Sequence, residues 1–136
     1  MGYHVSSLDE LGDGYGFRKV RQPLGVTAFG VNAVVFPPRY TGPEHYHDQQ
    51  DELYFVHRGT ATFTIDNQDH EVGEGGLVHV ESTTPRRVSN RTDEDLVLFI
   101  VGGKGGYVER DGQLTGPEEL ERRQGLSPKG ATTWTA

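Results

Sequence analysis

The stretch that decides the fold covers residues 42–59, GPEHYHDQQDELYFVHRG. One residue separates His45 from His47, so on an extended strand both side chains project from the same face. The polar residues 48–51 have the length of a hairpin loop. We therefore predict that the chain turns here, and that Glu52 returns on the partner strand of a hairpin, opposite the two histidines.

Two imidazoles and one carboxylate form a ligand set for a divalent transition metal, because these nitrogen and oxygen donors together suit Fe, Mn, Ni, Co, Cu or Zn. We predict that His45, His47 and Glu52 bind one such ion. Tyr54 follows Glu52 on the same face of its strand, so its hydroxyl is a candidate for substrate binding. Such a pair of histidines also occurs on solvated strands of acidic chains, so the spacing alone does not establish a metal site.

The arrangement HxH, four residues, Glu, six residues, Gly resembles the first signature of the cupin superfamily, with Gly59 in the closing position. Residues 75–90, GGLVHVESTTPRRVSN, are similar to the second signature of that family. The resemblance implies an all-β fold, a single small cupin barrel of two antiparallel sheets. It also implies a metal centre, and it supplies His45, His47 and Glu52 as three of its ligands.

The sequence departs from the family pattern in three places. Arg39 replaces a usual glycine, residues 81–83 lack the usual proline and glycine, and Arg86 replaces the histidine that is the fourth ligand in metal-binding cupins. A guanidinium stays protonated and offers no lone pair to a metal. Arg86 could instead bind an anionic substrate beside the metal, or it could pair with Glu52 in a metal-free pocket. A register shift of one residue would place Arg87 inward in its stead.

The chain has the length of one domain. Its pattern divides it into three segments, a polar N-terminal segment (1–16), the cupin barrel (17–110) and a C-terminal extension (111–136). Residues 33–36 are apolar on both faces, as expected for a strand buried inside a sandwich. Residues 115–118, Thr-Gly-Pro-Glu, predict a short helix that runs to about Gln124. We expect residues 126–136 to form a mobile tail.

Composition limits the partners of the protein. A net charge of −7 argues against nucleic acid as a partner, because phosphate recognition needs a basic patch. The chain has no cysteine, no signal-peptide pattern and no apolar run close to the roughly 20 residues of a membrane span. We therefore expect a cytoplasmic protein without a membrane partner. We also expect a homodimer, because the apolar residues 33–36 need cover.

The resemblance implies two functional classes, and the fold alone does not decide between them. In the first, the protein is a metal-dependent enzyme, an oxygenase or isomerase that acts on a small anionic organic molecule. In the second, it is a non-catalytic cupin that binds or senses a small molecule, metal-free and with Arg86 paired to Glu52.

Overall fold

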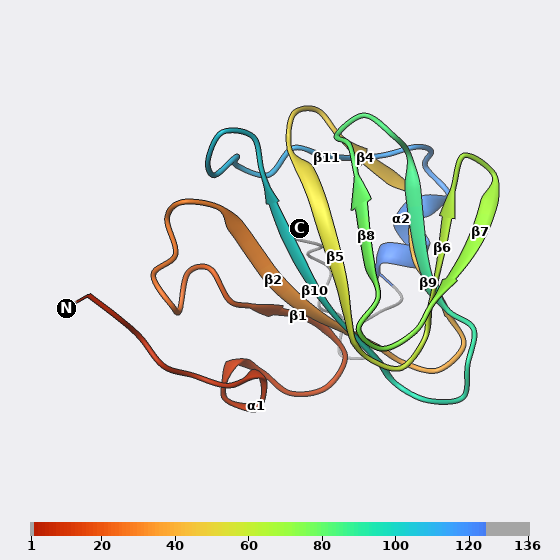
Figure 1. Cartoon of the computed structure of the whole chain (residues 1–136). Helices are drawn as coiled ribbons and strands as arrows, with labels where there is room; N and C mark the ends of the chain where they lie inside the picture. The colour runs from red at the N-terminus through yellow and green to blue at the C-terminus, as the bar shows by residue number, and fades with distance from the viewer. Residues whose placement is uncertain (1, 125–136) are drawn as a thin grey trace.

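The computed structural model describes residues 2–124, and two antiparallel sheets dominate it (Figure 1). The five-stranded sheet has the order β1 (Gly16–Lys19), β2 (Gly30–Phe36), β10 (Leu96–Gly103), β5 (Asp51–Arg58) and β8 (Leu77–Val80). The second sheet has the order β11 (Gly112–Leu114), β4 (His45–His47), β9 (Arg86–Asn90), β6 (Ala61–Ile65) and β7 (Gln68–Val72), with β3 (Tyr40–Thr41) beside β9. This architecture confirms the predicted all-β barrel.

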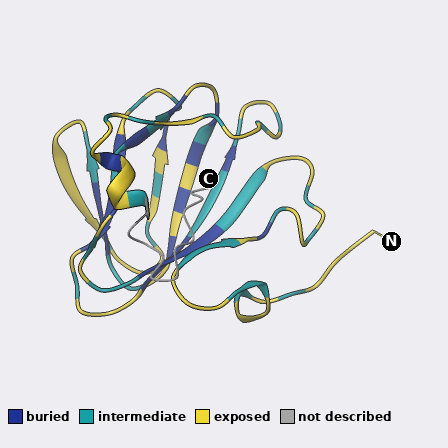
Figure 2. Ribbon diagram, turned by 180° about the vertical axis from the view of Figure 1, so that it is seen from behind, coloured by how far each residue is buried: buried dark blue, intermediate teal, exposed yellow. Residues whose placement is uncertain are grey.

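The core lies between the inward faces of the two sheets. Inward and outward residues alternate along β5, where Glu52, Tyr54 and Val56 are buried and their neighbours are exposed or half-buried (Figure 2). The buried apolar cluster draws on both sheets and contains Val34, Phe36, Tyr54, Val56, Ala61, Phe63, Val80, Val88, Leu96 and Leu98. Burial of this cluster fixes which face of each strand points inward, and it leaves the polar inward residues at one end of the barrel.

The predicted hairpin between the histidines and Glu52 is wrong. β4 pairs with β9 and β11 in one sheet, whereas β5 pairs with β10 and β8 in the other. Residues 48–50 therefore cross from one sheet to the other instead of closing a hairpin. The same alternation of side chains still brings the three groups together, because both strands present these residues to the barrel interior.

The C-terminal extension contacts the barrel through β11 and through the side chain of Thr115. β11 pairs with β4, with Gly112 opposite His47, so residues 112–114 complete the second sheet. The predicted helix is present as α2 (Glu119–Gln124), but Thr115 does not cap it, because the helix begins four residues later; the Thr115 hydroxyl donates to Glu44. The predicted mobile tail, 126–136, lies outside the described residues.

The other helix is α1 (Leu8–Leu11), which Ser7 caps by accepting a hydrogen bond from the Glu10 backbone N–H. Within residues 2–124, neither helix has the length and apolar character that crossing a bilayer requires.

The apolar stretch 33–36 is already buried within one chain, so it cannot be the exposed surface on which we based the dimer. β2 lies between β1 and β10, and the core covers its inward side chains. Exposed apolar side chains occur instead on the outer face of the five-stranded sheet, where Leu53, Phe55 and Leu77 lie on β5 and β8.

Candidate functional site

Three metal-binding side chains meet inside the barrel. His45 and His47 project inward from β4, and Glu52 projects inward from β5 of the opposite sheet; all three are buried. One potential ligand atom from each lies within 4.8 Å of the others. Glu52 Oε1 is 3.1 Å from His47 Nε2 and 3.9 Å from His45 Nε2. The three residues singled out in the sequence are thus close enough to hold a metal ion.

Tyr54 supports this cluster from the core side. Its hydroxyl donates to Glu52 Oε1 over 2.7 Å, so this tyrosine orients a carboxylate of the cluster. Burial raises the pKa of Tyr54 well above its usual range, and the nearby Glu52 charge raises it further. The hydroxyl therefore keeps its proton and remains a hydrogen-bond donor to Glu52.

The electrostatics of the cluster favour an ionised Glu52. Burial would raise the pKa of this carboxyl, but the His45 and His47 imidazoles outweigh burial and lower it. Burial lowers the pKa of His47, yet Glu52 and Asp111 more than compensate, so the pKa of this imidazole is raised. The buried carboxylate therefore needs positive charge beside it, which protonated imidazoles or a bound cation can supply.

Two observations test whether the cluster fits a metal. First, His47 Nε2 is buried and has no hydrogen-bond partner among residues 2–124, because its approach to Glu52 lacks hydrogen-bond geometry. Second, a cavity of about 20 Å³, space for one water-sized particle, borders His45, Glu52 and Tyr54, but its other lining residues are apolar and His47 is not among them, so the first observation carries the fit. An unpartnered imidazole nitrogen beside a carboxylate is a donor set that suits a divalent transition metal.

Arg86 lies inside the barrel, next to His45 in the β4–β9 pairing, and is fully buried. Its guanidinium donates to the backbone oxygens of Val80, Glu81 and Ser82. The predicted pairing with Glu52 is wrong, because among the described residues Arg86 forms no ion pair with any carboxylate. The guanidinium instead binds backbone oxygens at the end of β8 and in the turn that follows it.

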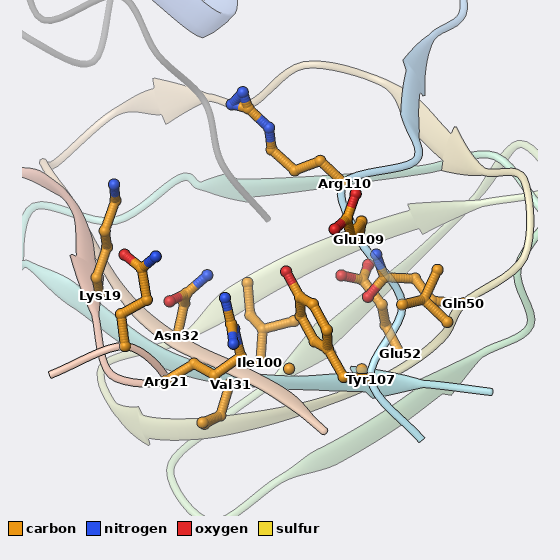
Figure 3. Close-up of a pocket in the computed structure, with 14 residues that line it drawn as sticks. Lys19, Arg21, Val31, Asn32, Gln50, Glu52, Ile100, Tyr107, Glu109 and Arg110 are labelled. Atoms are coloured by element: carbon orange, nitrogen blue, oxygen red, sulfur yellow. The ribbon is translucent and has the colours of Figure 1, made fainter. Parts of the chain in front are cut away.

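A larger cavity of about 310 Å³ opens beside the cluster, and Glu52 belongs to its wall (Figure 3). It lies on a row of inward residues across the five-stranded sheet, where Lys19 is opposite Asn32 and Asn32 is opposite Ile100. Gly102, opposite Glu52, leaves room there, since a side chain on it would collide with Gln50. Residues 107–110 form the far wall. The volume is at the lower end of the range for small-molecule sites.

The cavity wall carries three basic side chains in a chain of net charge −7. The Arg21 guanidinium stacks on the Tyr107 ring at 3.9 Å from its centroid. Lys19 and Arg110 form no hydrogen bond or ion pair through their side chains with the rest of residues 2–124. Glu52 and Glu109 are the acidic groups of the same wall, and Figure 3 places Glu52 across the cavity from Lys19.

Sequence reasoning missed most of this cavity. Its basic residues come from the end of β1, the loop after β1 and the 107–110 segment, which no spacing in the sequence relates to the histidines. It also missed Asp111, whose Oδ1 lies 2.8 Å from His47 Nδ1. The one available signal was an aspartate directly before the glycine that opens β11.

The fold is similar to those of solved cupin proteins. A solved cupin protein from Bacteroides fragilis is similar to this chain with a TM-score of 0.66 and 22% identity, over 81% of this chain and 91% of that chain. A sugar phosphate isomerase of a cupin superfamily from Silicibacter pomeroyi is similar with a TM-score of 0.62 and 26% identity, over 75% of this chain and 68% of that chain.

Among curated proteins, an uncharacterized protein of Methanocaldococcus jannaschii is 30% identical over 46 residues, 34% of this chain. That match spans only 37% of the relative's own length. The Cupin domain family matches residues 32–102, from β2 to the end of β10 and thus across both signatures. Because this match covers more than half of the 136 residues and the two sheets have the expected form, the chain belongs to the cupin family.

Proposed function

We propose that this cupin binds one divalent transition metal, Fe, Mn, Ni, Co, Cu or Zn, through His45, His47 and Glu52, and that it acts on a small anionic organic molecule in the adjoining cavity. The observation that carries the proposal is the position of Glu52. This residue belongs both to the buried cluster and to the wall of the larger cavity, so a molecule in the cavity lies next to the metal site.

The charge of the cavity supports an anionic ligand. Lys19, Arg21 and Arg110 would bind a phosphate or carboxylate group, which guanidinium and ammonium groups recognise by charge-assisted hydrogen bonds. Tyr107 holds Arg21 by stacking, so this guanidinium is oriented before the ligand arrives. Arg86, which we predicted as the anion-binding residue, has its guanidinium nitrogens NH1 and NH2 engaged by the backbone, so we assign anion binding to the cavity wall.

For the reaction we propose isomerisation of a small phosphorylated or carboxylated sugar, with oxygenation as the other possibility. The similarity to a sugar phosphate isomerase supports this substrate class. A bound metal would polarise a carbonyl or hydroxyl oxygen of the substrate as a Lewis acid. The chain itself would hold the anionic group at Lys19, Arg21 and Arg110, keep Glu52 oriented through Tyr54, and limit water access from the core side.

Metal analysis of protein purified without chelator tests the proposal. We expect near-stoichiometric metal in the wild type and none in the His45→Ala/His47→Ala double variant, while the exposed His57→Ala serves as the matched control. Added metal should stabilise the wild type by about 2.7 kcal/mol at a hundredfold excess over Kd. Trace metal together with an unchanged thermal transition on metal addition would contradict the proposal.

The anion site has a separate test. Calorimetric titration with a panel of sugar phosphates and small carboxylates should show binding that the Arg21→Met/Lys19→Met variant loses by about tenfold or more, since bonds to charged groups contribute roughly 1.5–3 kcal/mol each. Metal content of this variant should not change. Equal affinities in wild type and variant would place the ligand elsewhere.

A second candidate function is non-catalytic binding of the same ligand. The observation in its favour is Arg86, a buried cation without a carboxylate partner among the described residues, which would repel a dication at the cluster. A ligand that binds the metal-free protein, with no product formed in the presence of any of the six metals, would support this alternative.

We further propose a homodimer, now through the exposed apolar residues Leu53, Phe55 and Leu77 on the outer face of the five-stranded sheet. Sedimentation at micromolar concentration tests it, and a monomer of 15.0 kDa would rule it out.

A further inference from the structure

Asp111 connects the metal cluster to the C-terminal strand. Its Oδ1 lies 2.8 Å from His47 Nδ1, on the opposite side of the ring from the nitrogen that faces Glu52. The other histidine has a longer contact with an uncharged group at the same ring position, since His45 Nδ1 lies 3.5 Å from the backbone oxygen of Pro43. The two imidazoles of the cluster therefore differ in how firmly their orientation is fixed.

Asp111 is itself held in place by the turn between β4 and β5. Its Oδ2 accepts hydrogen bonds from the backbone N–H groups of Gln49 and Gln50 at 2.6 and 3.0 Å, and its Oδ1 accepts from Gln50 Nε2 at 2.7 Å. Both carboxylate oxygens of Asp111 therefore act as hydrogen-bond acceptors. The neighbouring β11 pairs with β4, with Gly112 opposite His47. The carboxylate thus has a fixed position relative to the imidazole.

An ionised carboxylate can only accept hydrogen bonds, so the proton between the two groups must reside on His47 Nδ1. In the neutral imidazole the lone pair is then on Nε2, the buried nitrogen that has no hydrogen-bond partner among residues 2–124 and faces Glu52 Oε1 at 3.1 Å. This is the tautomer that a metal at the cluster requires from His47. A carboxylate behind a metal-binding histidine raises its basicity and fixes its ring orientation.

We propose that Asp111 is a positioning residue, which fixes the Nδ1–H tautomer and the ring orientation of His47 and so presents Nε2 to a metal ion. This inference rests on the proposed metal site and adds to it a residue that lies outside both cupin signatures. It also gives β11 a role, since the strand carries the group that prepares a ligand on its neighbour β4.

The first test compares metal affinity in variants, with Zn²⁺ or Co²⁺ as the probe in competition with a chelator of known affinity. We expect Asp111→Ala to weaken the metal about 10–100-fold and Asp111→Asn to weaken it less, because the amide retains an oxygen acceptor. Asp48→Asn is the control for charge, as it removes an exposed carboxylate of the same turn that, among the described residues, accepts a hydrogen bond only from Gln113. It should weaken the metal by less than about threefold, since an exposed charge is screened by salt.

The second test needs no metal. Nitrogen-15 NMR of the histidine side chains at alkaline pH, where imidazoles are neutral, should show His47 as the Nδ1–H tautomer in the wild type and as a mixture in Asp111→Ala. If Asp111→Ala does not fold, the metal affinity of Asp111→Asn and the His47 tautomer of the wild type still test the inference. A wild type with the Nε2–H tautomer, or an Asp111→Ala variant whose tautomer and metal affinity equal those of the wild type, would overturn the inference. Absence of metal binding in the wild type would refute the proposed function, and the tautomer result would still decide the role of Asp111.

Discussion

Two neighbouring arginines on β9 point to opposite faces of their strand, and a buried glutamate lies on each side. Arg86 points into the barrel, where the carboxylate of Glu52 lies among imidazoles and a tyrosine. Arg87 points to the other face, where it donates to both oxygens of Glu119 at 2.8 and 3.0 Å. The two glutamates are 2% and 3% exposed, so burial does not distinguish them.

Their partners do. Glu119 also accepts hydrogen bonds from Arg122 and from the backbone N–H of Glu44, so its charge and its acceptor sites are satisfied by the protein. Among residues 2–124, Glu52 accepts one hydrogen bond, from Tyr54, and the imidazoles of His45 and His47 beside it can each offer a lone pair. Glu119, whose carboxylate is paired with two arginines, therefore attaches α2 to the barrel. Glu52, whose carboxylate lies among histidines, is available to bind a cation.

The largest expected effect concerns Arg86. Arg86→Met removes the donors of three backbone oxygens, so the metal-free protein should lose about 3 kcal/mol of unfolding free energy in urea titrations. Metal affinity should rise, because a repelling cation has gone. Arg91→Met, which breaks an exposed pair with Asp69, should cost less than about 1 kcal/mol. Unchanged stability, or weaker metal binding in a folded Arg86→Met protein, would contradict the structural role assigned to Arg86.

Replacing Glu119 and Glu52 by glutamine, one at a time, tests the different roles assigned to the two carboxylates. Glu119→Gln leaves Arg87 and Arg122 without their counter-charge, so the metal-free protein should be destabilised by about 2 kcal/mol while metal binding persists. Glu52→Gln should change the stability of the metal-free protein by less than about 1 kcal/mol near neutral pH, since it also removes a buried charge. It should abolish the stabilisation by added metal. The reverse pattern in thermal melts with and without metal would exchange the roles of the two carboxylates.

The last expected effect is a pH dependence of the Glu119 contribution. Burial alone would raise the pKa of Glu119, but hydrogen bonds from Arg87, Glu44 and Arg122 lower it from 4.5 to about 2. A pKa that is lower in the folded state means that ionised Glu119 stabilises the fold above pH 4.5, and that this contribution is lost as the pH falls from 4.5 through about 2. The stability difference between wild type and Glu119→Gln in urea should shrink over this interval. A difference that stays constant would show that the charge of Glu119 does not stabilise the fold.

The resemblance to the two cupin signatures was enough to predict the fold class, and local spacing was enough to single out the three residues of the cluster. The alternation of side chains on a strand places His45 with His47, and Glu52 with Tyr54, on inward faces whatever the pairing of those strands. For the same reason the predicted residues were brought together although the predicted hairpin was wrong. The apolar run 33–36 likewise identified a buried strand from composition alone.

Only the tertiary structure decided what each of these residues meets. Arg86 and Glu52 are both buried, yet the guanidinium bonds to the backbone of residues 80–82, because hydrogen-bond partners depend on which strands pair. Asp111 reaches His47 across 64 positions of the chain, and the basic wall of the cavity combines β1, the loop after it and the 107–110 segment. Spacing along a strand is fixed by backbone geometry, whereas contacts between distant segments arise only when the sheets assemble.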